Sequence, residues 1–216
     1  MIAIFGTKYK KMSSTIKLIE NRIKCHKRGS VFFHSDFADL GSSEATRKAV
    51  KRLCDDGMIR RCGRGIYSYP KVDTYFGLGE ISASNIDIAQ AYAKNKGIEL
   101  YLTTSAAQNI LGLETQNQIK TIYLTNGSST TIKTNNGEDI KLIHTSDKNL
   151  SKYKSDKMRL LNIALSGYGK ESIDDSLMEN IKKIIKSVDV EKVNNDIKLM
   201  NSWKRNLIYS LLQERS

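Results

Sequence analysis

The most informative pattern of apolar and polar positions lies between Ser42 and Tyr69. Its first part repeats apolar residues at helical spacing, at Ala45, Ala49, Val50 and Leu53. The opposite face carries polar residues, mostly basic, at Glu44, Arg47, Lys48, Lys51 and Arg52. Ser42 or Ser43 can cap the first turn, and Gly57 can supply the left-handed residue that ends the helix. The pattern therefore predicts an amphipathic helix near residues 43–56.

A β-hairpin is predicted directly after this helix. Met58–Arg61 and Ile66–Tyr69 have strand character, and the glycine-bearing turn CGRG at residues 62–65 joins them. The segment before the helix predicts three further elements in order. These are a helix from Ser13 with Ile16, Ile19 and Ile23 on one face, a strand at Val31–Phe33, and a short helix at Asp36–Leu40 that Ser35 caps and Gly41 follows. Helix, strand, helix, turn, helix and hairpin is the order of a winged helix-turn-helix, which we expect over residues 13–70.

The rest of the chain predicts a second domain over residues 80–216, after a boundary at Pro70–Gly79. Ser84–Asp87 resembles a capping box that opens a helix. Strands are expected at Glu99–Leu102 and Ile119–Leu124, with a helix capped by Thr103–Ser105 between them and a hairpin of Thr130–Thr134 with Asp139–Ile143 after them. The sheet should be antiparallel or mixed.

Apolar residues at helical spacing dominate the chain from Asp147 onward. They form three stripes: Met158, Leu161 and Leu165; Leu177, Ile181, Ile184 and Val188; and Val190, Val193, Ile197, Met200, Leu207 and Leu211. Such stripes can pack on the chain's own core or on a partner helix. The predicted fold class is α+β, with an N-terminal winged helix-turn-helix, a mixed α/β domain and a helical C-terminal region.

The charge of the chain is concentrated in its N-terminal third. The 216 residues carry a formal net charge of +12. Residues 1–70 hold 15 Lys and Arg against 6 Asp and Glu, whereas residues 71–216 hold 20 against 17. The excess positive charge thus coincides with the predicted DNA-binding motif, which favours a polyanionic partner. The alternative is that the Lys and Arg simply form a solvated face.

Targeting signals and a cysteine framework are not expected. No apolar run approaches the ~20 residues of a membrane-spanning helix. The segment MIAIFGTKYKKM places apolar residues before lysines, the reverse of a signal peptide, so a cytoplasmic protein is expected. The three cysteines lack CxxC spacing, which argues against disulfides and against a zinc site. Cys25 beside His26 has no matching pair elsewhere and is expected to be an ordinary surface feature.

The sequence holds no recognised catalytic motif, whether HExxH, a Walker-type loop, GxSxG or a dinucleotide-binding glycine fingerprint. Gly63-Arg64-Gly65 precedes no helix, so it cannot present helix amides to a phosphate. An acid–base cluster could be imagined at His34, Asp36 and Asp39, and a metal site at Asp174, Asp175 and Glu179. Both groups lie at predicted helix starts, where capping and the helix dipole explain them. His144 has no obvious partner. We therefore expect no enzyme, no catalytic residue, no metal and no cofactor.

The run RGSVFFHSDFADLGSSEATRKAVKRLCDDGMIRRCGRGIYSYPK resembles the N-terminal winged helix of AbiEi-type antitoxins, from bacterial abortive-infection toxin–antitoxin systems. TTSAAQNILGL and IKTIYLTNGSSTTIK are similar to the second domain of that family. The resemblance covers roughly residues 16–146. It implies that the first domain represses its own operon by binding inverted repeats in double-stranded promoter DNA. It also implies that the second domain neutralises a nucleotidyltransferase-like toxin without forming a stable complex.

The resemblance carries DNA contacts over to matching positions only. They are Ser43, Thr46, Arg47 and Lys51 on the helix, with Arg60, Arg61 and Arg64 around the wing. Lys48, on the same outer face, completes the predicted set. Arg47 and Lys51 lie four residues apart and should reach the major groove, while the wing arginines should contact phosphate or the minor groove. A dimer on an inverted repeat is expected, since one winged helix buries a modest interface.

Two other functions stay open at this stage. The protein could be a plain transcriptional regulator whose second domain senses a ligand or a partner. It could also be a nucleic-acid enzyme whose acidic residues are scattered along the chain. The nature of the gene directly downstream would separate the first of these from the antitoxin.

Overall fold

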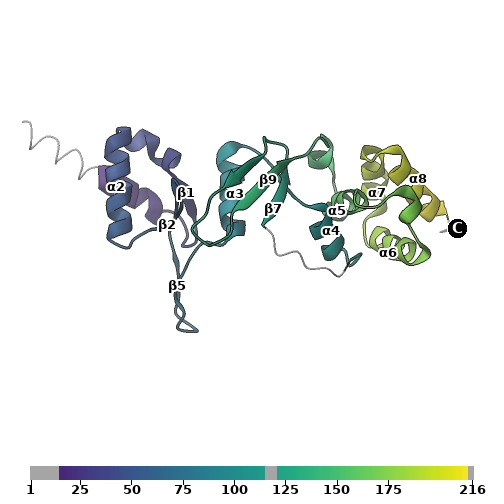
Figure 1. Ribbon diagram of the computed structural model, residues 1–216, viewed down its shortest axis with the longest axis horizontal. Coiled ribbons are helices and arrows are strands. Elements are labelled where there is room, and N and C mark those ends of the chain that lie inside the picture. Colours follow the sequence, from purple (N-terminus) through teal and green to yellow (C-terminus); the bar gives the residue numbers. More distant parts are fainter. Residues whose placement is uncertain (1–14, 115–120, 214–216) are drawn as a thin grey trace, which may run out of the picture. The chain divides into compact units, whose positions relative to one another are not determined.

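A computed structural model describes residues 15–114 and 121–213 of the chain (Figure 1). The protein is of the predicted α+β class, with many helices and three small sheets among these residues. The chain divides into two compact units, Met1–Gly97 with Thr131–Ile140, and Ile98–Thr130 with Lys141–Ser216. We call them the N-terminal unit and the C-terminal unit. The predicted arm at residues 1–12, the helix start at Ser13 and the strand start at Ile119 lie outside the described residues.

In the described part of the chain, the first element of the N-terminal unit is a helix at residues 15–24. The elements that follow are β1 (Val31–Phe33), the 3-10 helix η1 (His34–Leu40), α2 (Ser43–Asp55), β2 (Arg60–Gly63), β3 (Ile66–Ser68), β4 (Lys71–Asp73), β5 (Gly79–Ile81) and α3 (Asn85–Lys96). The predicted helix near residues 43–56 is confirmed, and Gly57 follows it with a left-handed φ of 76°. Its position explains the sharp end of α2, because glycine adopts this conformation without steric cost.

A three-stranded antiparallel sheet in the order β1-β3-β2 stands beside these helices. The predicted hairpin is confirmed, but its first strand begins two residues later than expected. Met58 and Ile59 each donate a backbone N–H to the Leu53 carbonyl, at 3.0 and 3.3 Å, so they complete the end of α2 instead of joining the sheet. The strand also ends later than predicted, at Gly63, so that only Arg64 and Gly65 form the turn. Gly65 has a φ of 72°.

Buried apolar side chains from the first helix, the sheet, η1 and α2 form one core. Its members are Ile19, Ile23, Phe32, Phe37, Ala49, Val50, Leu53 and Ile59. The apolar face predicted for α2 is thus the face that packs inward. The outer face of the helix is left to solvent.

The start of η1 corrects the predicted cap. Ser35 lies inside this helix rather than before it, and the carboxylate of Asp36 accepts the backbone N–H of Phe33 at 2.8 Å. A capping role was predicted for Asp36, and this contact confirms it. Asp39 forms a 2.6 Å ion pair with Arg22 of the first helix.

The Pro70–Gly79 segment, which was predicted as a domain boundary, contributes to a β-hairpin. Strands β4 and β5 pair antiparallel and form a sheet of their own. Helix α3 follows with the predicted capping box, in which Ser84 accepts from the Asp87 amide and Asp87 accepts from the Ser84 amide. This helix packs on β1 through Phe33 and Tyr92, so the N-terminal unit continues through Gly97.

A four-stranded sheet has the order β6-β7-β9-β8. Its strands are β6 (Leu100–Leu102), β7 (Ile122–Thr125), β8 (Thr130–Ile132) and β9 (Ile140–His144). Because β6 and β7 run antiparallel while β7 and β9 run parallel, the sheet is mixed, which is one of the two predicted alternatives. Helix α4 (Thr104–Ile110) lies between β6 and β7 in sequence, with Thr103 as its N-cap.

The C-terminal region is helical, as predicted. Its elements are η2 (Leu150–Lys152), α5 (Asp156–Leu165), η3 (Lys170–Ser172), α6 (Asp175–Lys186), α7 (Val190–Asp196), η4 (Ile197–Leu199) and α8 (Ser202–Gln213). The third apolar stripe is divided over α7, η4 and α8. Except for Val190, which is 58% exposed, the stripes pack on the chain's own core, which includes Met158, Leu161, Ile181, Ile197 and Ile208. Across the described ranges, no helix has the length and apolar character needed to cross a bilayer.

Candidate nucleic-acid interface

Helix α2 presents the predicted basic face to solvent, because its opposite face is locked into the core. Ser42 caps the helix by accepting the Ala45 amide at 3.3 Å, which satisfies one of the free donors of the first turn. Ala49 and Val50 are fully buried, and Leu53 is nearly so. These contacts fix both the position of the helix and its rotation about its own axis.

The outer face of α2 consists of two neighbouring stripes that differ in their electrostatics. One stripe pairs its charges along the helix: Lys48 lies 2.6 Å from Glu44, and Arg52 lies 3.9 Å from Asp56. The other stripe is Ser43, Arg47 and Lys51, spaced four residues apart and all exposed. Within the described parts of the chain, neither Arg47 nor Lys51 has a hydrogen bond or an ion pair. We call Ser43, Arg47 and Lys51 the open stripe; its two cations are available to a phosphate or a base edge.

Thr46 does not belong to this surface. It is fully buried, and its hydroxyl donates to the Ser42 carbonyl at 3.0 Å. A buried hydroxyl that already forms a hydrogen bond with the backbone cannot contact a duplex. Thr46 is therefore removed from the predicted DNA contacts. Its spacing from Ala49, Val50 and Leu53 was the sequence signal for burial.

The three arginines of the hairpin differ in how free they are. Arg60 forms a 2.6 Å ion pair with Glu80 of β5. Arg61 is exposed, although its Nε donates to the Gly63 carbonyl at 3.2 Å. Arg64 stands at the exposed turn and has no partner among residues 15–114 and 121–213. Arg64 and Arg61 are therefore better placed than Arg60 to meet a ligand.

A segment distant in sequence, residues 131–140, holds the outer side of β2. Asn135 donates its backbone N–H to the Cys62 carbonyl at 2.7 Å and its side-chain amide to the Arg61 carbonyl at 3.0 Å. A Cβ at Gly63 would lie 2.4 Å from the Lys133 carbonyl oxygen, so only glycine fits there. Neither Gly63 nor Asn135 was predicted in this role, since no local pattern links them.

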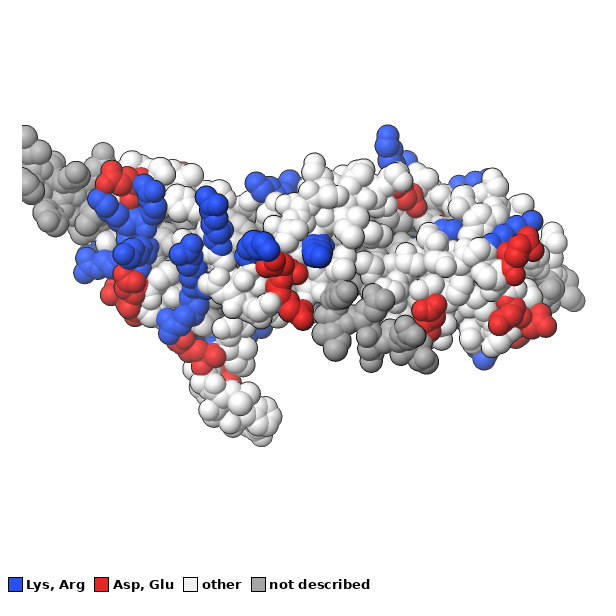
Figure 2. All heavy atoms as spheres, viewed as in Figure 1, with Lys and Arg blue, Asp and Glu red and all other residues white. Residues whose placement is uncertain are grey.

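Two further cations that were not predicted lie at the root of the β4–β5 hairpin. The Arg28 guanidinium stacks over the Tyr69 ring at 4.6 Å and donates to the Pro70 carbonyl at 3.1 Å. The alkyl chain of Lys71 lies against Gly29, where an added Cβ would be 2.3 Å from Cε. Both side chains are exposed. Figure 2 shows Lys and Arg gathered over the part of the N-terminal unit that α2 and its neighbouring sheet form.

The cysteines near this face pack as apolar groups. Burial raises the pKa of the Cys54 thiol and of the neighbouring Tyr67 hydroxyl, so both stay protonated at neutral pH. Cys62 is buried and donates to Ser68 Oγ at 3.1 Å. In the ranges that the structure describes, no three His, Cys, Asp or Glu side chains gather in a way that could hold a metal ion.

The other polar groups considered in the sequence have structural partners. His144 Nδ1 lies 2.8 Å from the Gly127 carbonyl. Asp174 caps α6 by accepting the Leu177 amide at 2.7 Å, as the capping interpretation predicted. Glu179 forms a 3.1 Å ion pair with Lys182.

The chain was compared with known protein families and with curated proteins. The model of the "Family of unknown function (DUF6088)" matches residues 18–193. The match thus covers most of both compact units, including α2, the β2–β3 hairpin and helices α3 to α6. The comparison with curated proteins gave no match.

Proposed function

We propose that this chain, which belongs to the DUF6088 family of unknown function, binds double-stranded DNA through its N-terminal unit. We further propose that this unit acts as a winged helix-turn-helix, with α2 in the major groove and the β2–β3 hairpin as the wing. The observation that carries the proposal is the open stripe of α2. An exposed row of one hydroxyl and two cations, the cations without partners in the described residues, suits a helix that meets phosphates and base edges.

The order of elements supports the winged-helix interpretation. A helix at 15–24, strand β1, the short helix η1, α2 and the β2–β3 hairpin follow one another in the order of that motif. The wing strands share one antiparallel sheet with β1. The hairpin turn at Arg64-Gly65 is thereby held at the edge of the same core that orients α2.

The paired and open charges suggest a division of labour. We assign base reading to Arg47 and Lys51 and backbone contact to Arg61 and Arg64. Lys48 contributes less, because an exposed i,i+4 pair with Glu44 already neutralises it. Arg60 contributes through the placement of the hairpin, since its ion pair with Glu80 joins β2 to β5. Two copies on an inverted repeat would supply the interface area that one module lacks.

The wider role rests on the resemblance to AbiEi-type antitoxins. On that basis we propose that the protein represses its own operon and neutralises a nucleotidyltransferase-like toxin through its remaining part, without a stable complex. We assign it no enzymatic activity and no cofactor, and we place it in the cytoplasm. The domain limits of residues 13–70 and 80–216 stay a prediction, and α3 packs on β1 across them.

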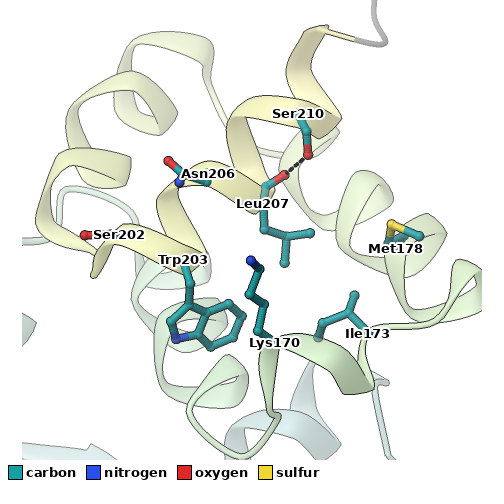
Figure 3. A pocket seen from close by; sticks show the side chains of 8 residues that line it. All are labelled: Lys170, Ile173, Met178, Ser202, Trp203, Asn206, Leu207 and Ser210. Atoms are coloured by element: carbon teal, nitrogen blue, oxygen red, sulfur yellow. Dashed lines mark hydrogen bonds between the residues drawn. The ribbon is translucent and has the colours of Figure 1, made fainter.

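The alternative is a plain transcriptional regulator whose C-terminal unit senses a ligand, and one feature favours it. A groove of about 520 Å³ between η3, α6 and α8 is lined by Trp203, Leu207 and Met178, with Lys170 in its middle (Figure 3). This volume is within the range of small-molecule sites. An amphipathic anion would match an apolar wall with a single ammonium group.

Selection of bound duplexes from a random pool, followed by titrations at several salt concentrations, tests DNA binding. Arg47→Ala should lose about 1–3 kcal/mol of discrimination between the selected and random duplexes, because a bidentate arginine–guanine contact is removed. Arg64→Ala should weaken all duplexes alike and flatten the salt slope by about one unit. Lys48→Ala is the matched control and should change little. Equal loss of selected and random DNA in Arg47→Ala would contradict the base-reading role.

A further inference from the structure

The β4–β5 hairpin exposes its most apolar side chains at its tip. Tyr75 is 88%, Phe76 77% and Leu78 71% exposed. The hairpin extends away from the three-stranded sheet, and its tip carries no Lys, Arg, Asp or Glu between residues 74 and 79 (Figures 1 and 2). A contiguous group of large apolar side chains with this exposure is uncommon on a monomer and marks an interaction site.

The tip has a defined conformation. The Asp73 carboxylate accepts the backbone N–H groups of Tyr75, Phe76 and Leu78 at 3.0, 3.0 and 3.1 Å. These hydrogen bonds hold the pKa of Asp73 below its usual range. The rings of Tyr75 and Phe76 meet edge to face with centroids 5.0 Å apart. The tip is thus pre-organised before it meets any partner, and the charge of its neighbouring carboxylate is offset by three donors.

Two exposed cations lie at the root of the hairpin, near the ion pair of Arg60 with Glu80. Arg28 and Lys71 are exposed there, and the Arg28 side chain is fixed by Tyr69 and Pro70. The one carboxylate of β5, Glu80, is paired with Arg60 of β2. A pre-organised apolar tip on a two-stranded ribbon with a basic root is complementary to a duplex, whose phosphates flank an apolar stack of bases.

We propose that the β4–β5 hairpin is a DNA-deforming arm: it enters the minor groove and inserts Phe76 and Leu78 between base pairs. The proposal rests on the DNA binding proposed above and extends it to a second contact from the same unit. Apolar wedges of Phe or Leu partially unstack base steps in this way and bend the duplex toward the major groove. Arg28 and Lys71 bind the phosphates on either side. Flexible pyrimidine–purine steps are the favoured sites, because they cost least to unstack.

The test uses the full chain and a short duplex with 2-aminopurine at its TA steps and a fluorophore at each end. The wild-type protein should raise the 2-aminopurine fluorescence and shorten the end-to-end distance. The double variant Phe76→Ala/Leu78→Ala should bind about 10-fold more weakly, since stacking contacts are lost. It should keep the salt slope and give neither signal. Ile86→Ala, which removes an exposed aliphatic side chain of α3, should behave as the wild type.

Each contrary result has a distinct meaning. Binding by the wild type without unstacking or bending would overturn the arm and leave DNA binding intact. Deformation of the duplex by the double variant would overturn the arm in the same way. If the double variant instead changes the oligomeric state in sedimentation while deformation is unchanged, the tip is a protein contact and the proposal is overturned. No binding of any duplex by the wild type would remove both proposals.

Discussion

Lys204 of α8 is a lysine whose charge is buried, with 4% of its surface exposed. Its ammonium group donates to the Asn162 carbonyl at 2.7 Å, to Asn162 Oδ1 at 3.1 Å and to Ser166 Oγ at 2.6 Å. None of these acceptors is a carboxylate, so desolvation dominates and lowers the pKa of Lys204 to about 8. The side chain thus links α8 to α5 by hydrogen bonds, although burial destabilises its protonated, charged form.

A pH dependence of stability follows. As the pH rises through about 8 the native state loses the Lys204 proton, while the unfolded chain keeps it until the pH approaches the ordinary pKa of 10.5. The unfolded state then binds more protons, so the free energy of unfolding should rise with pH across this interval. The rise is at most about 3 kcal/mol. Urea titrations of the wild type and of Lys204→Met at several pH values measure this rise. Tyrosine titration contributes equally to both proteins, so it cancels when their free energies of unfolding are subtracted.

The prediction concerns only the difference between the wild type and Lys204→Met in how the free energy of unfolding changes with pH. Lys204→Met should lack the rise, whereas Lys198→Met, at an exposed lysine, should keep it. An identical pH profile for the wild type and Lys204→Met would show that Lys204 keeps an ordinary affinity for its proton in the folded chain.

At the scale of elements, the position of strand β2 depends on contacts with residues 131–140. Gly63 forms an isolated antiparallel bridge with Thr134, next to the Lys133 carbonyl that leaves no room for a side chain. The bulge between Arg61 and Gly63 lets this strand pair with β3 on one side and meet the distant segment on the other. Arg60 and Arg61 therefore take their position from contacts on both sides of β2.

Substitution of Gly63 by Ala should destabilise the N-terminal unit. The added methyl group would overlap a backbone oxygen that cannot rotate away, which costs about 1–3 kcal/mol. Thermal or urea unfolding measures the loss. Gly169→Ala is the matched control, since its φ of −77° suits any residue and the nearest atom would lie 3.7 Å from the new Cβ. Similar stability of the two variants would show that β2 and residues 131–140 separate readily.

At the scale of the whole molecule, the proposed repression and the proposed toxin neutralisation should be separable by point substitution. The double variant Arg47→Ala/Lys51→Ala changes only exposed side chains of α2, so the fold of both units should be kept. A truncation at residue 80 would instead remove the strand on which α3 packs. The double variant should release a reporter placed behind the operon promoter by at least about 10-fold, since it loses the two cations to which we assign base reading.

Neutralisation is then followed as growth during co-expression with the downstream gene. Rescue of growth by the double variant is the expected result. Loss of rescue by this variant, with wild-type rescue intact, would mean that DNA binding is needed for both activities. A downstream gene without toxicity would instead favour the plain regulator.

Local patterns were sufficient for α2, for the start of α3 and for the outward face of the candidate site, but not for the β4–β5 hairpin. The spacing of Ala49, Val50 and Leu53 placed α2 and its inward face, and Ser84 with Asp87 placed the start of α3. These are contacts between residues a few positions apart, and their energetics depend little on the rest of the chain.

The tertiary structure decided what depends on contacts distant in sequence. Among the described residues, it separated Arg47, Lys51 and Arg64, which have no partner there, from Arg60, whose partner Glu80 lies on another hairpin. It also showed that the segment predicted as a boundary contributes to a pre-organised hairpin, and it placed Asn135 against β2. The sequence by itself determined helices, turns and total charge, because these follow from neighbouring residues. Only the folded chain decided which charges are free and which glycine is obligatory, because ion pairs and close backbone contacts join segments that no local pattern connects.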